Sequence, residues 1–429
     1  MEKRFYPALD ETVYWNTLQN GLTVAVVPRP GMTKKLCYFV TDFGAIHQEF
    51  SVDGVKHTVP AGIAHYLEHK LFDMPDYDVT ERFSMLGAIP NAFTSYDITA
   101  YYFSCTENFE KSLRLLLEFV STPYFTEETV NKEQGIIGQE IDMTEDNPDS
   151  RIFQMLMQGM YENHPVNIPI LGSKESIARI TPENLTLCHR AFYRPDNMLL
   201  CVVGDVDAEA VSRIAEEILP ENPRETVTVT RTWQEEMKAK TPLVTAEMDI
   251  ADPMFQLGFK YEPMDKGEEA VRREVVAELA CEALFGESSR LYLELYEKGV
   301  IDSSFGGGFD TIEGMAMLTA GGDSEDPEAV QDAILAEAKR IVTEGIPEED
   351  FLRMKRSALG RRIRALDSFE STCFRLCAYH LSGFDYFRFP TVYEAVEEKD
   401  VLEFLNTAVT EDRMSLAIIY PNEEEETIC

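Results

Sequence analysis

Two histidines and a glutamate stand close together in the sequence, at His65, Glu68 and His69. Histidines at this spacing lie on one face of a helix, because four residues advance a helix by a little over one turn. Two neutral imidazoles held in this way form half of a site for Zn²⁺. Glu68 flanks the same face without being forced to bind, which suits a general base for metal-bound water. The spacing therefore predicts that His65 and His69 bind zinc and that Glu68 acts as the base.

A structural role for the two histidines is the alternative. They would then pack on a core helix, with one ring hydrogen-bonded to a backbone carbonyl. The chain has only seven histidines, which makes a chance pair around a glutamate uncommon. The residues around the motif favour the zinc interpretation.

A third ligand must come from elsewhere, because a catalytic zinc keeps three protein ligands and one open position. The best candidate is the segment 127–141, which carries Glu133 and Glu140 on one stripe of an expected helix. Thr126 is its expected N-cap. One glutamate can bind the metal while the other orients a ligand or water. The alternative is that both are solvated, since the chain has 76 acidic residues. Apolar residues recur in the segment at helical spacing: Val130, Ile137 and Ile141.

These motifs resemble those of the pitrilysin and mitochondrial-processing-peptidase family of inverted (H-x-x-E-H) zinc peptidases. The resemblance covers nearly the whole chain in order, through residues 60–72, 87–95, 133–140, 146–148, 171–173, 193–199 and 203–205. In that family the second glutamate of the pair is the third zinc ligand. The resemblance therefore implies Zn²⁺ bound by His65, His69 and Glu140, with Glu133 as a supporting acid of the catalytic site.

The same resemblance implies where a substrate binds. Asn91, Ala92, Phe93 and Thr94 resemble the family's edge strand, on which an extended peptide is bound as an added strand. The residues alone would predict only a strand after a Gly/Pro turn. The implied activity is that of a zinc endopeptidase for short or unfolded peptides.

The length and patterning predict two domains, since 429 residues are too many for one core. We expect an N-terminal zinc-binding domain over 1–220, a linker over 221–240 and a C-terminal domain over 241–429. Strands are expected near 22–26, 37–40 and 100–103, and a helix over 109–120. The resemblance implies an α+β fold of two homologous domains, each a mainly antiparallel sheet with helices on one side.

An internal alignment agrees with duplication. Residues 64–72 align with 277–285, and the glutamate helix aligns with a later helix in which Met354 and Arg361 replace Glu133 and Glu140. The second half is therefore expected to hold no metal site.

Composition narrows the partners and the compartment. A formal net charge of −37 argues against nucleic acid or anionic lipid as a partner. No apolar run approaches the ~18 residues of a membrane span, and the first residues do not form a signal peptide. Eight cysteines without a C-x-x-C pair are expected to be reduced packing residues of a cytoplasmic protein.

One departure from the family concerns the stabilisation of an oxyanion. Active members complete the site with an Arg and a Tyr from the second domain type, but Tyr296 and Asp302 fall at those positions here. Arg290 and Tyr292 lie nearby, but their spacing does not indicate that they replace the missing Arg and Tyr. The loss predicts a heterodimer in which a homologous partner subunit supplies the Arg and Tyr. A homodimer is the weaker alternative, since both copies would lack the pair.

Two other functions are alternatives to the peptidase. A non-catalytic peptide-binding or scaffold subunit would be expected to lose the His65, Glu68, His69 and Glu140 set, which is intact. A structural zinc protein would normally use four protein ligands, often Cys, and no cysteine lies near the motif.

Overall fold

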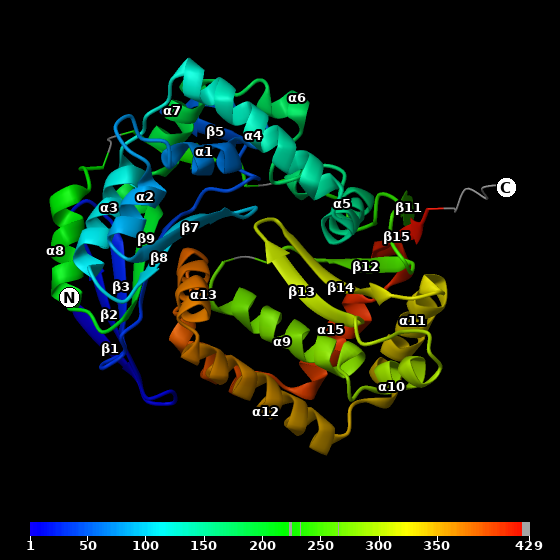
Figure 1. Cartoon of the computed structure of the whole chain (residues 1–429). Coiled ribbons are helices and arrows are strands. Elements are labelled where there is room, and N and C mark those ends of the chain that lie inside the picture. The colour runs from blue at the N-terminus through cyan, green and yellow to red at the C-terminus, as the bar shows by residue number, and fades with distance from the viewer. Residues whose placement is uncertain (223–224, 232, 265, 423–429) are drawn as a thin grey trace. The chain divides into compact units, whose positions relative to one another are not determined.

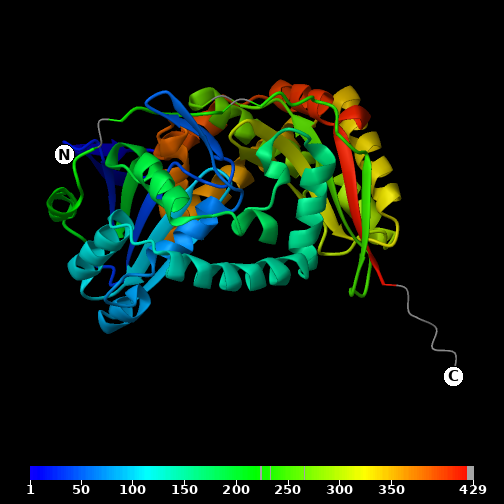
Figure 2. The same cartoon turned by 90° about the horizontal axis from the view of Figure 1, so that it is seen from above.

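The structure, a computed structural model, describes residues 1–222, 225–231, 233–264 and 266–422. Figures 1 and 2 show the elements in two views. In these ranges every helix is too short or too polar to span a lipid bilayer. The seven cysteines of the described part are buried and unbridged, as expected for packing residues, and Cys429 lies outside it.

The chain folds into two compact units, each assembled from separate segments. Unit 1 contains Met1–Ile141, Pro169–Thr230 and Arg362–Pro390, and unit 2 contains Asp142–Ile168, Arg231–Arg361 and the described chain from Thr391. This division differs from contiguous domains over 1–220 and 241–429. The expected linker 221–240 is shared between the units, and its residues 223, 224 and 232 lie outside the described residues. The bounds 1–220 and 241–429, which describe the two duplicated halves of the sequence, stay a prediction.

Unit 1 is built on a seven-stranded sheet of order β1-β2-β3-β9-β4-β8-β7. Its strands are β1 Glu2–Tyr6, β2 Glu11–Thr17, β3 Thr23–Pro28, β4 Lys35–Thr41, β7 Ala88–Thr94, β8 Thr99–Cys105 and β9 Met198–Gly204. Only β3 and β9 are parallel neighbours. The strands expected near 22–26, 37–40 and 100–103 are β3, β4 and β8. The stretch that resembles a substrate strand is β7, which lies at the edge of the sheet.

Helices cover one face of this sheet and form the main core of unit 1. They are α1 Ile63–Leu71, α2 Val79–Met85, α3 Phe109–Ser121, α4 Glu127–Glu145, α6 Lys174–Ile177, α7 Pro182–Phe192 and α8 Ala208–Ile218. Alternate side chains of the strands enter this core, as Leu200 and Val202 of β9 do. Cys201 between them instead contacts α13 (Phe369–Leu381), which therefore packs on the opposite face. A small sheet, β10-β5-β6, completes the unit with β5 Glu49–Val52, β6 Val55–Thr58 and β10 Val227–Val229.

Unit 2 repeats the strand order of unit 1 in a shorter sheet, β11-β15-β12-β14-β13. Its strands are β11 Leu243–Met248, β12 Met254–Tyr261, β13 Gly306–Ile312, β14 Met315–Asp323 and β15 Met414–Pro421. The first pair is parallel and the others are antiparallel, as in β3-β9-β4-β8-β7. Its helices are α5 Pro148–Met160, α9 Glu268–Phe285, α10 Arg290–Glu297, α11 Pro327–Glu344, α12 Glu348–Arg364, α14 Phe389–Ala395 and α15 Glu398–Ala408. The matching topology confirms the α+β class with two homologous sheets.

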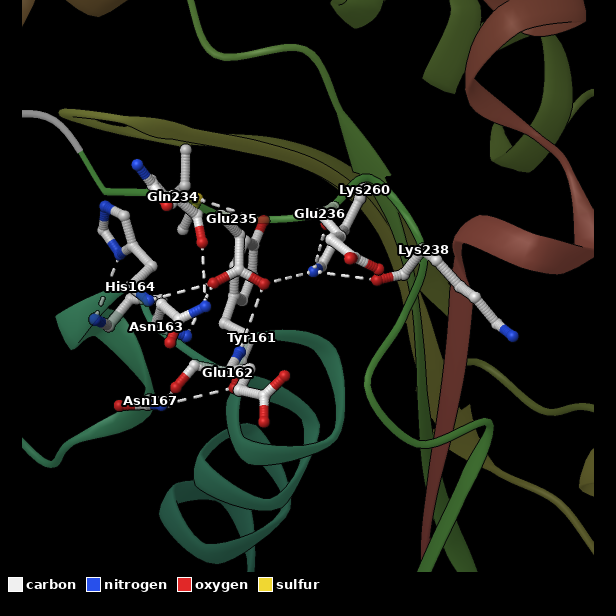
Figure 3. Close-up of polar contacts among 12 residues, drawn as sticks. Tyr161, Glu162, Asn163, His164, Asn167, Gln234, Glu235, Glu236, Lys238 and Lys260 are labelled. Carbon is white, nitrogen blue, oxygen red and sulfur yellow. Dashed lines mark hydrogen bonds and ion pairs between the residues drawn. The ribbon is translucent and has the colours of Figure 1, made fainter.

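A buried ion pair holds the segment before β11 against the end of α5 in unit 2 (Figure 3). The Glu235 carboxylate accepts three successive backbone N–H groups at residues 162–164, at 3.1, 2.7 and 3.0 Å. Lys260 Nζ donates to the same carboxylate at 2.7 Å and to the carbonyls of Glu236 and Lys238 at 2.8 and 3.1 Å. Because Lys260 is only 1% exposed, its charge depends on these partners.

Candidate metal centre

The helix that carries the two histidines begins at a tight backbone contact. Gly62 precedes α1 with φ 89°, and a Cβ at this position would lie 2.4 Å from the Leu171 carbonyl oxygen. Only glycine combines this conformation with this approach. The histidines then follow within the first two turns of α1, where the rings of His65 and His69 stand 4.5 Å apart between centroids.

The second helix, α4, is anchored beside α1. Thr126 caps it as predicted, because the Thr126 hydroxyl accepts the backbone N–H of Thr129 at 3.2 Å. The Tyr66 hydroxyl of α1 donates to the Val130 carbonyl of α4. The expected apolar stripe of α4 is buried: Val130, Ile137 and Ile141. Burial of this stripe leaves the face with Glu133 and Glu140 turned toward α1.

The three predicted metal ligands converge. Glu140 Oε1 lies 3.5 Å from His65 Nε2, and Glu140 Oε2 lies 3.5 Å from His69 Nε2. The ligand atoms of the three residues lie within 4.8 Å of one another. Two ligands each about 2.0–2.1 Å from a tetrahedral zinc are about 3.3–3.4 Å apart, so the observed separations fit this ion.

Glu133 supports one histidine from behind. Its Oε1 lies 3.0 Å from His69 Nδ1, the ring nitrogen that does not face Glu140. This contact selects the tautomer with the proton on Nδ1 and leaves Nε2 as a metal donor. Burial opposes a charge on this ring, but Glu133 and the neighbouring carboxylates raise the pKa of His69. His65 Nδ1 is buried without a hydrogen-bond partner among the described residues.

Glu68 lies beside this cluster but is not one of its three ligands. It is 8% exposed, and its Oε2 accepts the Thr94 hydroxyl of β7 at 2.7 Å. Burial raises the pKa of Glu68, and the Thr94 hydrogen bond and the two histidines oppose that rise. A buried carboxylate held next to a donor cluster is suited to proton transfer.

The four residues expected to bind substrate occupy β7, but their side chains divide between its faces. Thr94 points to Glu68, whereas the Phe93 ring packs 5.9 Å from Phe374 of α13 on the other face. Asn91 is exposed, and Ala92 is half-buried against the main core. The sequence did not reveal the Thr94–Glu68 contact, since it joins residues of different elements. The close approach of Gly62 was also missed, although a glycine directly before the helix was a signal for it.

The equivalent place in unit 2 holds an ion pair. Arg361 of α12, which aligns with Glu140, donates to Glu282 Oε2 of α9 at 2.8 Å. Glu282 aligns with His69. The Arg361 guanidinium thus stands where a third metal ligand would be needed, and the lack of a metal site in the second half stays a prediction.

The residues at the expected Arg and Tyr positions make local contacts within unit 2. Tyr296 is 51% exposed and stacks on Tyr292, with ring centroids 5.7 Å apart. The Asp302 carboxylate accepts the Ser304 hydroxyl at 2.5 Å. Arg290 pairs with Glu294 at 2.6 Å on the surface of α10.

The sequence matches two family models that cover most of the chain. Residues 57–174 match insulinase, peptidase family M16, and residues 179–358 match the peptidase M16 inactive domain. The zinc protease YmfH of Bacillus subtilis (strain 168) is 38% identical over 423 residues, which are 97% of this chain and 98% of that protein.

Solved structures agree with this match. An M16-like peptidase from Alicyclobacillus acidocaldarius has a TM-score of 0.92 at 31% identity, over 96% of this chain and 99% of that chain. A protease from Helicobacter pylori has a TM-score of 0.79 at 20% identity, over 95% of this chain and 99% of that chain. The second likeness concerns the fold alone.

Proposed function

Because this chain belongs to the insulinase family of peptidases, peptidase family M16, we propose that it is a zinc-dependent endopeptidase for short or unfolded peptides. The family resemblance read from its motifs is thereby confirmed. The convergence of His65, His69 and Glu140 on one point carries the proposal. Relatives of this chain are named zinc proteases, which supports zinc as the metal.

The side chains around this point have separate roles. His65, His69 and Glu140 would hold the zinc, which when bound lowers the pKa of water and polarises a carbonyl. Glu68 takes up the proton of the attacking water at a carboxylate oxygen and returns it to the leaving amine. Thr94 orients that carboxylate through its hydroxyl.

The open edge of β7 would receive the peptide as an added strand. This edge has no neighbouring strand among the described residues, so its outward backbone groups can pair with an extended peptide. Its Thr94 end contacts Glu68 at 2.7 Å. A peptide paired there would therefore pass directly beside the base and the proposed zinc.

We propose further that the active form is a heterodimer. This chain has Tyr296 and Asp302 at the positions where the Arg and Tyr are expected. Tyr296 is exposed, and Asp302 accepts a hydrogen bond from Ser304. A homologous partner subunit would supply both groups to the developing oxyanion. A non-catalytic scaffold role is less well supported, because the complete donor set and Glu68 are kept together. A cytoplasmic location stays a prediction.

Metal analysis of purified variants tests the zinc assignment. Wild-type protein is expected to carry about one zinc per chain. His65→Ala, His69→Ala and Glu140→Ala are each expected to empty the site, whereas His57→Ala, which lies outside the cluster, keeps the metal. Full zinc occupancy in all three ligand variants would contradict the assignment.

Complementation tests the partner. The isolated chain should bind zinc but cleave peptides on the order of 10²–10³ times more slowly than the heterodimer, because donors to the oxyanion are missing. A homologous subunit with the Arg/Tyr pair should restore activity, and the same subunit carrying Arg→Ala should not. High activity of the isolated chain that no partner increases would refute the heterodimer.

A further inference from the structure

The hydrogen bonds of the β7–β8 hairpin determine which backbone groups face the open edge of β7. The Ser95 N–H donates to the Ile98 carbonyl at 2.8 Å and closes the hairpin. Residues two apart in an antiparallel strand turn their backbone groups in the same direction. Odd-numbered residues of β7 therefore bond to β8, and even-numbered residues turn their groups to the open edge.

The middle of this edge has few donors for an incoming strand. Pro90 has no N–H at all. The next outward N–H, that of Ala92, already donates to Asn91 Oδ1 at 2.8 Å. A peptide carbonyl that pairs with Ala92 must therefore displace the Asn91 side chain.

Asn91 can make this displacement without disturbing the core. It lies opposite Tyr102 of β8 on the face away from Glu68. Asn91 is also exposed, so no packing prevents its amide from moving. Its side chain thus covers the Ala92 N–H in the free protein and is free of packing that would keep it there.

We propose that the Asn91 side chain gates strand addition on β7. In the free protein it occupies the Ala92 N–H and leaves the strand without an available donor between Ala88 and Thr94. An incoming peptide carbonyl replaces Asn91 Oδ1 at the Ala92 N–H, and the Asn91 side chain turns into solvent. The gate rests on the proposed function, since it concerns the strand on which the peptide is added. It makes Asn91 a positioning residue that sets affinity for the peptide backbone regardless of side-chain sequence.

Equilibrium binding tests the gate without turnover. Zinc-loaded Glu68→Gln protein would be titrated with a fluorescein-labelled, unstructured peptide that the wild-type protein cleaves, and Kd read from anisotropy. Adding Asn91→Ala is expected to lower Kd about two- to tenfold, because a neutral hydrogen bond no longer has to be broken. Adding Asn91→Asp is expected to raise Kd, because a charged acceptor holds the N–H more tightly. Asn406→Ala, an exposed Asn on α15, is the matched control and should leave Kd unchanged.

Hydrogen exchange adds a readout that needs no peptide. Asn91→Ala should speed exchange of the Ala92 amide in the free protein. An unchanged exchange rate would contradict the hydrogen bond between the Ala92 N–H and Asn91 Oδ1. An unchanged or higher Kd for Asn91→Ala, in a parent protein that binds peptide, would overturn the gate alone. If the wild-type protein cleaves no peptide even with the partner subunit, and the parent binds none, the proposed function and the gate both fail.

Discussion

Replacing Gly62 by Ala perturbs the start of the histidine helix without touching any proposed ligand. The residue has φ 89°, and the left-handed conformation costs an L-residue about 1–2 kcal/mol. The added Cβ would also lie 2.4 Å from the Leu171 oxygen, where ordinary contact begins at 3.4 Å, a deficit of 3.4 − 2.4 = 1.0 Å. Crowding of this kind costs a further ~1–3 kcal/mol. We expect Gly62→Ala to lower the free energy of unfolding by about 2–5 kcal/mol.

Gly31→Ala is the matched control, because Gly31 has φ 80° and no atom lies within 4 Å of the position that its Cβ would take. It should lower the free energy of unfolding only by the ~1–2 kcal/mol that the left-handed conformation costs an L-residue. Urea unfolding of the metal-free proteins measures both values. Since a shift of α1 would disturb the 3.5 Å separations between Glu140 and the histidines, competition with a fluorescent chelator should show weaker zinc binding only in Gly62→Ala. Equal stability and equal zinc affinity of the two variants would refute this reasoning.

Three further predictions concern stability. Burial lowers the pKa of His189 from 6.5 to about 4, so below about pH 6.5 the unfolded chain binds a proton that the folded chain does not bind. The free energy of unfolding from urea titrations should therefore fall by about 2 kcal/mol between pH 7 and 5, and His189→Gln should make this fall smaller. Glu235→Ala leaves the buried Lys260 without its opposite charge and should lower the free energy of unfolding by about 3–5 kcal/mol. Adding Lys260→Met to the same chain should restore most of this stability, and a lack of restoration would mean that the lost charge pair is not the cause. Gly135→Ala and Gly138→Ala on α4 meet no atom within 4 Å, so each should raise the thermal midpoint through a gain of about 0.5–1 kcal/mol, and a lower midpoint would contradict the open surroundings.

Local pattern was sufficient to predict the elements that carry the site. Four-residue spacing placed His65 and His69 on one helix face, and seven-residue spacing placed Glu133 and Glu140 on one stripe of α4. These periodicities depend on a few neighbouring residues, and the cap at Thr126 is equally local. That Glu140 is the third ligand and Glu133 a supporting acid followed from the family resemblance rather than from periodicity, and the contact of Glu133 with His69 Nδ1 is seen only in the structure.

Contacts between distant elements could not be read from the pattern. The Thr94–Glu68 hydrogen bond depends on how β7 lies beside α1, which the spacing within either element does not determine. The return of residues 362–390 to unit 1 was missed for the same reason, because the pattern within a segment does not say on which sheet it packs. The Asn91 bond to the Ala92 N–H depends on which backbone groups face β8, and only the closed hairpin reveals it.

The central claim is that this chain holds a zinc ion for peptide hydrolysis with Glu68 as the base. Its most direct test is to measure zinc content and peptide hydrolysis on one preparation of Glu68→Gln, together with the partner subunit if the wild-type chain needs one. We predict about one zinc per chain, as in the wild type, and hydrolysis lower by orders of magnitude. Loss of the metal, or turnover close to that of the wild type on the same peptide, would contradict the account.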